Sequence, residues 1–270
     1  MFVQAHSLVF HRVPYIASGR LASEQWRVIS NFFDLVNEIE VNNKTTKALY
    51  RHIELWNGHI PKGRVSQKTR QVFFELKNFL SDKEIGEEVI SEYLSARARY
   101  YRKFILKQKE DQLEFLQSVV EPEGLLLCYA NGLSYKQVDY FKQNAKASFL
   151  TSCLIAISTD SKEINSITPL SDLRRFGLSR LNYQEYKKHP GAFREFIERF
   201  SEEILYYQKL SNNFSKQLPL KLKIAKAFEH SANQSLLAKI AAEPAWIFYN
   251  EPTNLTAYKL KNTIARRIYA

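Results

Sequence analysis

Apolar residues recur at steps of three and four along most of this chain, which is the spacing of a helix with one buried stripe. The clearest stripe consists of Trp26, Ile29, Phe32, Phe33, Val36 and Ile39. The same spacing predicts helices over residues 24–41, 44–56, 66–80, 83–119, 135–157, 190–210, 219–240 and 253–268, with a short turn over residues 170–176. Pro122 is expected to stop the long helix over residues 83–119. We therefore predict an all-α bundle of about eight to ten helices.

The composition agrees with this fold class. The 270 residues contain only 8 glycines and 8 prolines, too few turn formers for the many hairpins of a β-sandwich or barrel. No G-x-G-x-x-G or G-x-x-x-x-G-K-[ST] sequence is present, which argues against folds that bind nucleotides in such loops. Because neither a linker nor an internal repeat interrupts the chain, we expect a single domain over residues 1–270.

The cysteine, histidine and charge content limit the classes of site and partner. Cys128 and Cys153 lie in apolar runs and form no C-x-x-C pair, so we interpret them as buried thiols, and the six histidines form no metal motif. No apolar stretch is long enough to span a bilayer and no signal peptide is recognisable, which predicts a cytoplasmic protein. The net charge of +11 favours a negatively charged partner: nucleic acid, anionic lipid or a diphosphate.

Three stretches resemble the squalene/phytoene synthases, all-α enzymes that join two prenyl diphosphates head to head. The clearest, residues 169–179, reads P-L-S-D-L-R-R-F-G-L-S and is similar to the family's L-P-x-D-[DE]-L-x-R-F-G-L-S segment. Residues 15–18 resemble the family's opening F-Y-L-A-S, and residues 236–248 resemble its closing I-L-x-K-I segment. The resemblance spans nearly the whole chain and implies a single-domain multi-helix bundle of the isoprenoid synthase type.

In that family, two D-x-x-x-D motifs hold the Mg²⁺ ions that neutralise the departing diphosphate, because residues at i and i+4 offer two carboxylates from one helix face. The carbocation then needs a dry apolar cavity. The resemblance implies that this cavity is lined by Phe33, Phe149, Leu150, Cys153 and Leu154. The packed core of a helix bundle explains the same side chains.

The first aspartate-rich motif is incomplete in this chain. Where the family has V-D-D-[IL]-V-D, this chain has V-N-E-I-E-V, so Asn37 replaces the first metal-binding aspartate and Val41 the last. Asp34 and Glu38 stand at i and i+4 one register away, with Glu40 close by, and these three are the candidate metal ligands of the helix. Exposed acidic residues opposite the apolar stripe explain the same pattern.

The second motif and the basic loop after it have lost more of their charge. Where the family has Q-L-T-N-[IL]-L-R-D, this chain has F-L-T-S-C-L-I-A, which places Ile155 at the arginine and Ala156 at the first aspartate. Asp160 remains, and Glu163 lies where the family has a basic R-G-R-x-Y segment, so these two complete the candidate metal ligands. The candidate catalytic residues are then Asp34, Glu38 and Asp160.

One branch of the family has lost the same acidic positions and includes an assembly factor for respiratory complex I. The run L-T-S-C-L-I-A at residues 150–156 resembles that branch's V-T-C-L-R-A-T more than the catalytic L-T-N-I-L-R-D. The resemblance implies a non-catalytic protein without a cofactor, which binds a prenyl lipid or assembles with a protein partner at the inner membrane, in the cytoplasm or the mitochondrial matrix. The alternative is an active Mg²⁺-dependent transferase that uses farnesyl or geranylgeranyl diphosphate.

Two basic segments interleaved with aromatic residues bear on the choice of partner. One carries Arg97, Arg99, Arg102, Lys103, Lys107 and Lys109 beside Tyr100, Tyr101 and Phe104. We interpret it as a solvated helix face with aromatic rings turned to the core, rather than as a nucleic-acid or lipid stripe. The other segment, residues 258–269, is basic and amphipathic, which suits either a peripheral membrane contact or closure of the core.

Overall fold

The computed structural model describes residues 20–43, 46–60, 63–102, 106–157 and 168–249. In those ranges every regular element is a helix, so the all-α prediction is confirmed. The longer helices are α2 (Arg20–Asn43), α4 (Gln67–Asp82), α5 (Glu88–Arg102), α8 (Val138–Ala156), α12 (Pro190–Phe214) and α13 (Leu220–Ala242). The shorter ones are α3 (Thr46–Trp56), α6 (Lys109–Phe115), α7 (Glu121–Ala130), α10 (Leu170–Arg175), α11 (Tyr183–Lys188) and α14 (Trp246–Tyr249).

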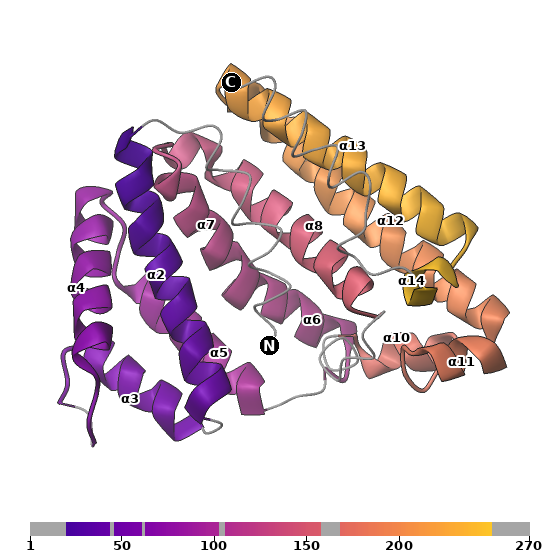
Figure 1. The fold of residues 1–270 in the computed structure, drawn as a ribbon, viewed down its shortest axis with the longest axis horizontal. Coiled ribbons are helices and arrows are strands. Elements are labelled where there is room, and N and C mark those ends of the chain that lie inside the picture. Colours follow the sequence, from indigo (N-terminus) through magenta and orange to yellow (C-terminus); the bar gives the residue numbers. More distant parts are fainter. Residues whose placement is uncertain (1–19, 44–45, 61–62, 103–105, 158–167, 250–270) are drawn as a thin grey trace.

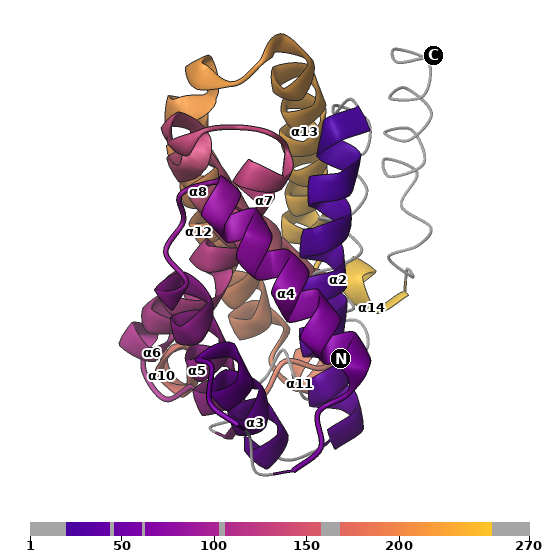
Figure 2. The same cartoon turned by 90° about the vertical axis from the view of Figure 1, so that its left-hand side faces the viewer.

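Helix α8 occupies the middle of the bundle, between α7 and α12 (Figure 1). Helix α2 packs against α4 and α7, α3 packs against α5, and α13 packs against α12. Figure 2 shows α2 and α13 on the same side of α8 and α12. None of the described helices is both long enough and apolar enough to cross a bilayer.

The predicted apolar stripes form the core. On α2, the described members of the stripe are at most 7% exposed: Trp26, Ile29, Phe32, Phe33 and Val36. On α8, buried side chains occur on nearly every face, as its apolar second half predicts for a central helix. Gly124 of α7 lets these two layers approach closely, because a Cβ atom at this position would lie 2.7 Å from the carbonyl oxygen of Phe141 on α8.

The prediction of one long helix over residues 83–119 is wrong. Helix α5 begins only at Glu88, after a turn in which Glu84 has a φ of 55°. A separate helix, α6, begins at Lys109, because the side chain of Asp111 accepts hydrogen bonds from the backbone amides of Lys107 and Gln108 and caps the new N-terminus. Local side-chain capping therefore overrides the apolar periodicity here.

The prediction that Pro122 stops a helix is wrong, because Pro122 lies in the first turn of α7. The preceding turn is a π-helical segment, η2 (Leu116–Val120). Proline lacks an amide hydrogen, and its ring crowds the carbonyl group four residues earlier. The wider π turn makes room for the ring, so the helical run from α6 through η2 to α7 is not interrupted. Helix α11 was not predicted, and the predicted helix over residues 253–268 lies outside the described residues.

Candidate functional site

Asp34 and Glu38, the candidate metal ligands on α2, lie on an exposed face near the start of α4. The ammonium of Lys68 on α4 donates a hydrogen bond to Glu38, with 2.7 Å between Nζ and Oε2. The pKa of Lys68 is raised by this hydrogen bond, by the charge of Glu38 and, to a smaller extent, by that of Asp34. One lysine therefore interacts with both carboxylates.

The donor set needed for magnesium is not assembled in the described part of the chain. Mg²⁺ takes six oxygen ligands and usually binds through carboxylates and water. Glu38 is paired with Lys68, and no group of three His, Cys, Asp or Glu side chains among the described residues is close enough to hold a metal ion. The side chains of Glu40, Asp160 and Glu163 lie outside the described residues, so their role as ligands stays a prediction.

The residues of the predicted prenyl pocket are all buried, and none is more than 7% exposed: Phe33, Phe149, Leu150, Cys153 and Leu154. The ring of Phe33 lies 6.5 Å from that of Tyr93 on α5, between ring centres. The ring of Phe149 lies 5.3 Å from that of Phe115 on α6. These positions contribute to the hydrophobic core that joins α2, α5, α6 and α8, and their contact with a lipid stays a prediction.

Both cysteines are buried free thiols, as the sequence predicted. Burial raises the pKa of Cys128 to about 12. Burial also raises the pKa of Cys153 well above its ordinary value. A thiol that remains protonated at neutral pH is a poor nucleophile and a poor metal ligand, so neither cysteine is suited to covalent catalysis.

Polar side chains are buried where α8, α12 and α13 meet, a feature that the sequence analysis missed. The Nε2 atom of His230 on α13 lies 3.3 Å from Oδ1 of Asn144 on α8. One turn earlier on α13, the buried ammonium of Lys226 lies 5.9 Å from the ring centre of Phe141. Gln208 of α12 is 2% exposed, and neither polar atom of its amide has a hydrogen-bond partner among the described residues. An unsatisfied buried amide is costly, so the surroundings of Gln208 are suited to water or to a polar group of a ligand.

The i, i+4 spacing of Lys226 and His230 was the available signal for this buried polar interior. Both residues share a helix face with the buried Leu222, which places two ionisable groups in line with an apolar side chain. These two residues are buried because α8 covers that face of α13. The packing of α8 on α13 could not be predicted from the spacing alone.

The basic segment between residues 97 and 109 is not a uniformly solvated face. Arg97 is 6% exposed and pairs with Glu123 of α7, with 3.5 Å between Nη1 and Oε1, and Tyr93 donates a hydrogen bond to the same oxygen at 2.9 Å. Arg99 is exposed and pairs with Glu114 of α6. The prediction is thus wrong for Arg97, which is required to neutralise a buried carboxylate.

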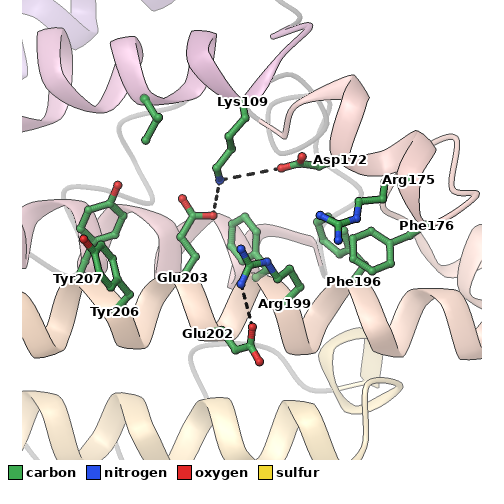
Figure 3. Close-up of a pocket in the computed structure, with 12 residues that line it drawn as sticks. Lys109, Asp172, Arg175, Phe176, Phe196, Arg199, Glu202, Glu203, Tyr206 and Tyr207 are labelled. Carbon is green, nitrogen blue, oxygen red and sulfur yellow. Dashed lines mark hydrogen bonds and ion pairs between the residues drawn. The ribbon is translucent and has the colours of Figure 1, made fainter.

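A groove of about 530 Å³ lies between α6, α10 and α12 (Figure 3). The ammonium of Lys109 crosses it, lying 2.5 Å from Oε2 of Glu203 and 3.9 Å from Oδ2 of Asp172. Two arginines and two rings lie to the right of this lysine in Figure 3: Arg175, Phe176, Phe196 and Arg199. Phe200 of α12 also lines the groove. Asp172, Arg175 and Phe176 belong to the P-L-S-D-L-R-R-F-G-L-S stretch, which was therefore the sequence signal for the groove.

Helix α10 is held in place by backbone geometry that this same stretch encodes. Gly177 has a φ of 68° and reverses the chain after α10, with Leu178 donating a backbone hydrogen bond to Leu173 at 2.9 Å. Oε1 of Glu185 in α11 accepts a hydrogen bond from the backbone amide of Ser179 at 2.9 Å, and this bond lowers the pKa of Glu185. The R-F-G-L-S sequence therefore has a structural role: it fixes the angle between α10 and α11.

A search of solved structures finds a close match in fold. The crystal structure of squalene synthase HpnC from Alicyclobacillus acidocaldarius superposes with a TM-score of 0.64 and 15% sequence identity, over 90% of this chain and 93% of that chain. This chain has a squalene synthase-like fold. The isoprenoid synthase type of bundle, which the sequence resemblance implied, is therefore confirmed. The sequence matches no family model, and no curated protein matches it.

Proposed function

We propose that this protein has the fold of a squalene synthase without its catalysis and binds a prenyl lipid, as a diphosphate or another isoprenoid. The observation that carries the proposal is the loss of carboxylates from both motifs, since Asn37 and Ala156 stand where the family has aspartates. The exposed ion pair between Lys68 and Glu38 agrees with it. This pair occupies one of the two carboxylates that α2 would offer to a metal from one helix face.

The chemistry explains why this ion pair argues against turnover. Release of an allylic diphosphate needs divalent cations to neutralise the leaving group, and those cations need clustered carboxylates. An ammonium at 2.7 Å from Oε2 of Glu38 competes for that carboxylate and repels a divalent cation. Asn37 and Ala156 supply no carboxylate where the family has aspartates.

Binding of a lipid is supported by a different set of features. The neighbour in fold is a squalene synthase, so an isoprenoid is the natural ligand class to test. Helix α8 combines an apolar second half with polar residues in its first half, where Asn144 contacts His230. A helix of that kind offers an apolar environment to a prenyl chain and polar atoms to its head group.

A role in assembling a membrane-bound respiratory complex is the finer part of this proposal. It rests on the L-T-S-C-L-I-A run at residues 150–156, which resembles the branch of the family that contains such an assembly factor. In that role the protein acts at the inner membrane surface through a protein partner, and no cofactor is needed.

The test is incubation of the purified protein with farnesyl or geranylgeranyl diphosphate and Mg²⁺. We expect no release of diphosphate above background, while an unreactive farnesyl thiodiphosphate quenches tryptophan fluorescence in a saturable manner. Cys153→Met should weaken this binding, whereas Leu205→Met, at an exposed position of α12, should not. Both variants are checked by circular dichroism and by their melting temperatures.

Two results would overturn the proposal. Release of diphosphate that disappears with chelator and with Asp34→Asn or Asp160→Asn would establish the alternative, an active Mg²⁺-dependent prenyl transferase. Absence of saturable quenching by both prenyl diphosphate analogues and neutral isoprenoids would exclude the lipid ligand.

A further inference from the structure

The groove between α6, α10 and α12 lies on the side of the bundle away from α2, which carries Asp34 and Glu38. In Figure 2, α6 and α10 are on the left of the bundle, whereas α2 and α13 are on the right. Its volume of about 530 Å³ falls within the range of about 300–1,000 Å³ that is typical of small-molecule sites. No part of the proposed prenyl-lipid function uses this groove.

The three cationic side chains of the groove differ in how strongly they are paired with carboxylates. Lys109 is engaged by two carboxylates, Glu203 and Asp172. Arg199 pairs with Glu202 at 3.0 Å, but both side chains are about two-thirds exposed, so this pair is weak and easily exchanged for a ligand. Arg175 forms no ion pair with any described residue, and its guanidinium carbon lies 6.0 Å from the ring centre of the adjacent Phe176.

Three phenylalanines form the apolar lining beside these arginines: Phe176 is half-buried, and Phe196 and Phe200 are 3% and 7% exposed. The ring centres of Phe176 and Phe196 are 5.8 Å apart in an edge-to-face arrangement, and those of Phe196 and Phe200 are 5.8 Å apart and stacked. Figure 3 shows Arg175 and Arg199 reaching toward this surface from α10 and α12. A flat apolar group can pack on the exposed part of Phe176, above the two buried rings, while a guanidinium holds an anion at its edge.

The carboxylates of the groove limit the charge of that anion. Asp172, Glu202 and Glu203 equal the three cations of the lining in number, so the groove has no net positive charge to hold a dianion. A ligand with a single carboxylate matches Arg175, the arginine of the groove that has no ion pair with a described residue, because a guanidinium and a carboxylate form two parallel hydrogen bonds. We propose that this groove is a binding site for an aromatic carboxylate, with Arg175 as its anion-binding residue and the phenylalanines as its apolar surface.

The experiment is a titration of the full chain with 2-naphthoate, followed by ligand-detected NMR and by calorimetry. We expect saturable binding of one molecule per chain. Arg175→Gln should raise the dissociation constant about tenfold, as expected for loss of one charge-assisted contact, and Arg175→Lys should give an intermediate value. Arg194→Gln is the matched control, because Arg194 is exposed on the same helix as Arg199 and does not line the groove.

Two further probes test the charge argument. Neutral 2-naphthylmethanol should bind the unsubstituted protein about tenfold more weakly than 2-naphthoate, and dianionic 2-naphthyl phosphate should bind no more tightly than 2-naphthoate. Equal binding of the alcohol and the carboxylate, an Arg175→Gln variant with unchanged affinity, or tighter binding of the phosphate would each overturn the proposal. An equal loss of affinity in Arg194→Gln would do so as well, since it would place the probe elsewhere.

Discussion

The ammonium of Lys68 lies 2.7 Å from a carboxylate oxygen of Glu38 and so joins α4 to the helix that resembles the first aspartate-rich motif. Both side chains are at least half exposed, so this ion pair is weak on its own. It places a lysine beside a motif in which Asn37 and Val41 already stand where the family has aspartates.

The first prediction is that millimolar Mg²⁺ does not stabilise the protein. A ligand that binds only the folded state raises the free energy of unfolding by about 2.7 kcal/mol at one hundred times its dissociation constant, which differential scanning fluorimetry would detect as a higher melting temperature. Magnesium chloride and sodium chloride at equal ionic strength should therefore give the same melting curve. A magnesium-specific increase that Asp34→Asn removes would contradict this expectation.

The buried ion pair between Arg97 and Glu123 gives a second prediction. Glu123→Ala removes the carboxylate that pairs with the buried guanidinium of Arg97, so the free energy of unfolding should fall by about 3–5 kcal/mol. Urea denaturation measures this change, and the double variant Arg97→Met with Glu123→Leu should recover part of it. Glu202→Ala, which breaks an exposed pair, should change the free energy by no more than about 0.5 kcal/mol. A similar effect of both single substitutions would contradict the buried role of Glu123.

Glu185 predicts a dependence of stability on pH. The backbone amide of Ser179 favours the charged carboxylate and lowers the pKa of Glu185 in the folded state below its ordinary value of 4.5. Its contribution is thus present above that value and is lost as the pH falls below it toward the folded pKa. Glu185→Gln should melt at a lower temperature than the unsubstituted protein at neutral pH, and the two melting temperatures should converge in acid. A difference that persists in acid, or one that Glu195→Gln on the exposed face of α12 reproduces, would show that another group is responsible.

Gly177 supplies a fourth prediction. Its φ of 68° is costly for a residue with a Cβ atom, so Gly177→Ala should lower the free energy of unfolding by about 1 kcal/mol, although no atom lies within 4 Å of the added carbon. Gly191 at the start of α12 also has open space around it and has no positive φ, so Gly191→Ala should be neutral or slightly stabilising. Equal destabilisation by both changes, measured in urea, would argue against the backbone explanation.

A fifth prediction concerns the net charge of +11 and membrane association. Each lysine or arginine near an anionic bilayer contributes about 1 kcal/mol, and salt screens this attraction within about one Debye length. The protein should sediment with anionic but not neutral vesicles, less so at higher salt, and still less after Lys259→Glu with Arg266→Glu. These two residues lie outside the described ranges, so the experiment also tests the predicted amphipathic helix. Equal recovery with both kinds of vesicle would mean that the charge serves only solubility.

The sequence was sufficient to determine the fold class and most of the helices. The apolar spacing is a local property of the sequence in α2, α4, α8, α12 and α13. These apolar faces are buried in the bundle, and the spacing predicts their burial without specifying which helices cover them. The resemblance of residues 169–179 to one family also led to the correct bundle type. It could not show that Gly177 is needed for a chain reversal and that Asp172 and Arg175 border a groove.

The environment of the charged residues depends on tertiary packing. Arg97 and Lys109 belong to one basic segment, yet Arg97 is buried against Glu123 and Lys109 bridges two carboxylates from α10 and α12. Lys68, thirty residues away along the chain, lies beside Glu38, one of the predicted metal ligands. Electrostatic interactions act through space over a few ångströms, so partners that are distant in sequence decide whether a carboxylate binds a metal, a lysine or water.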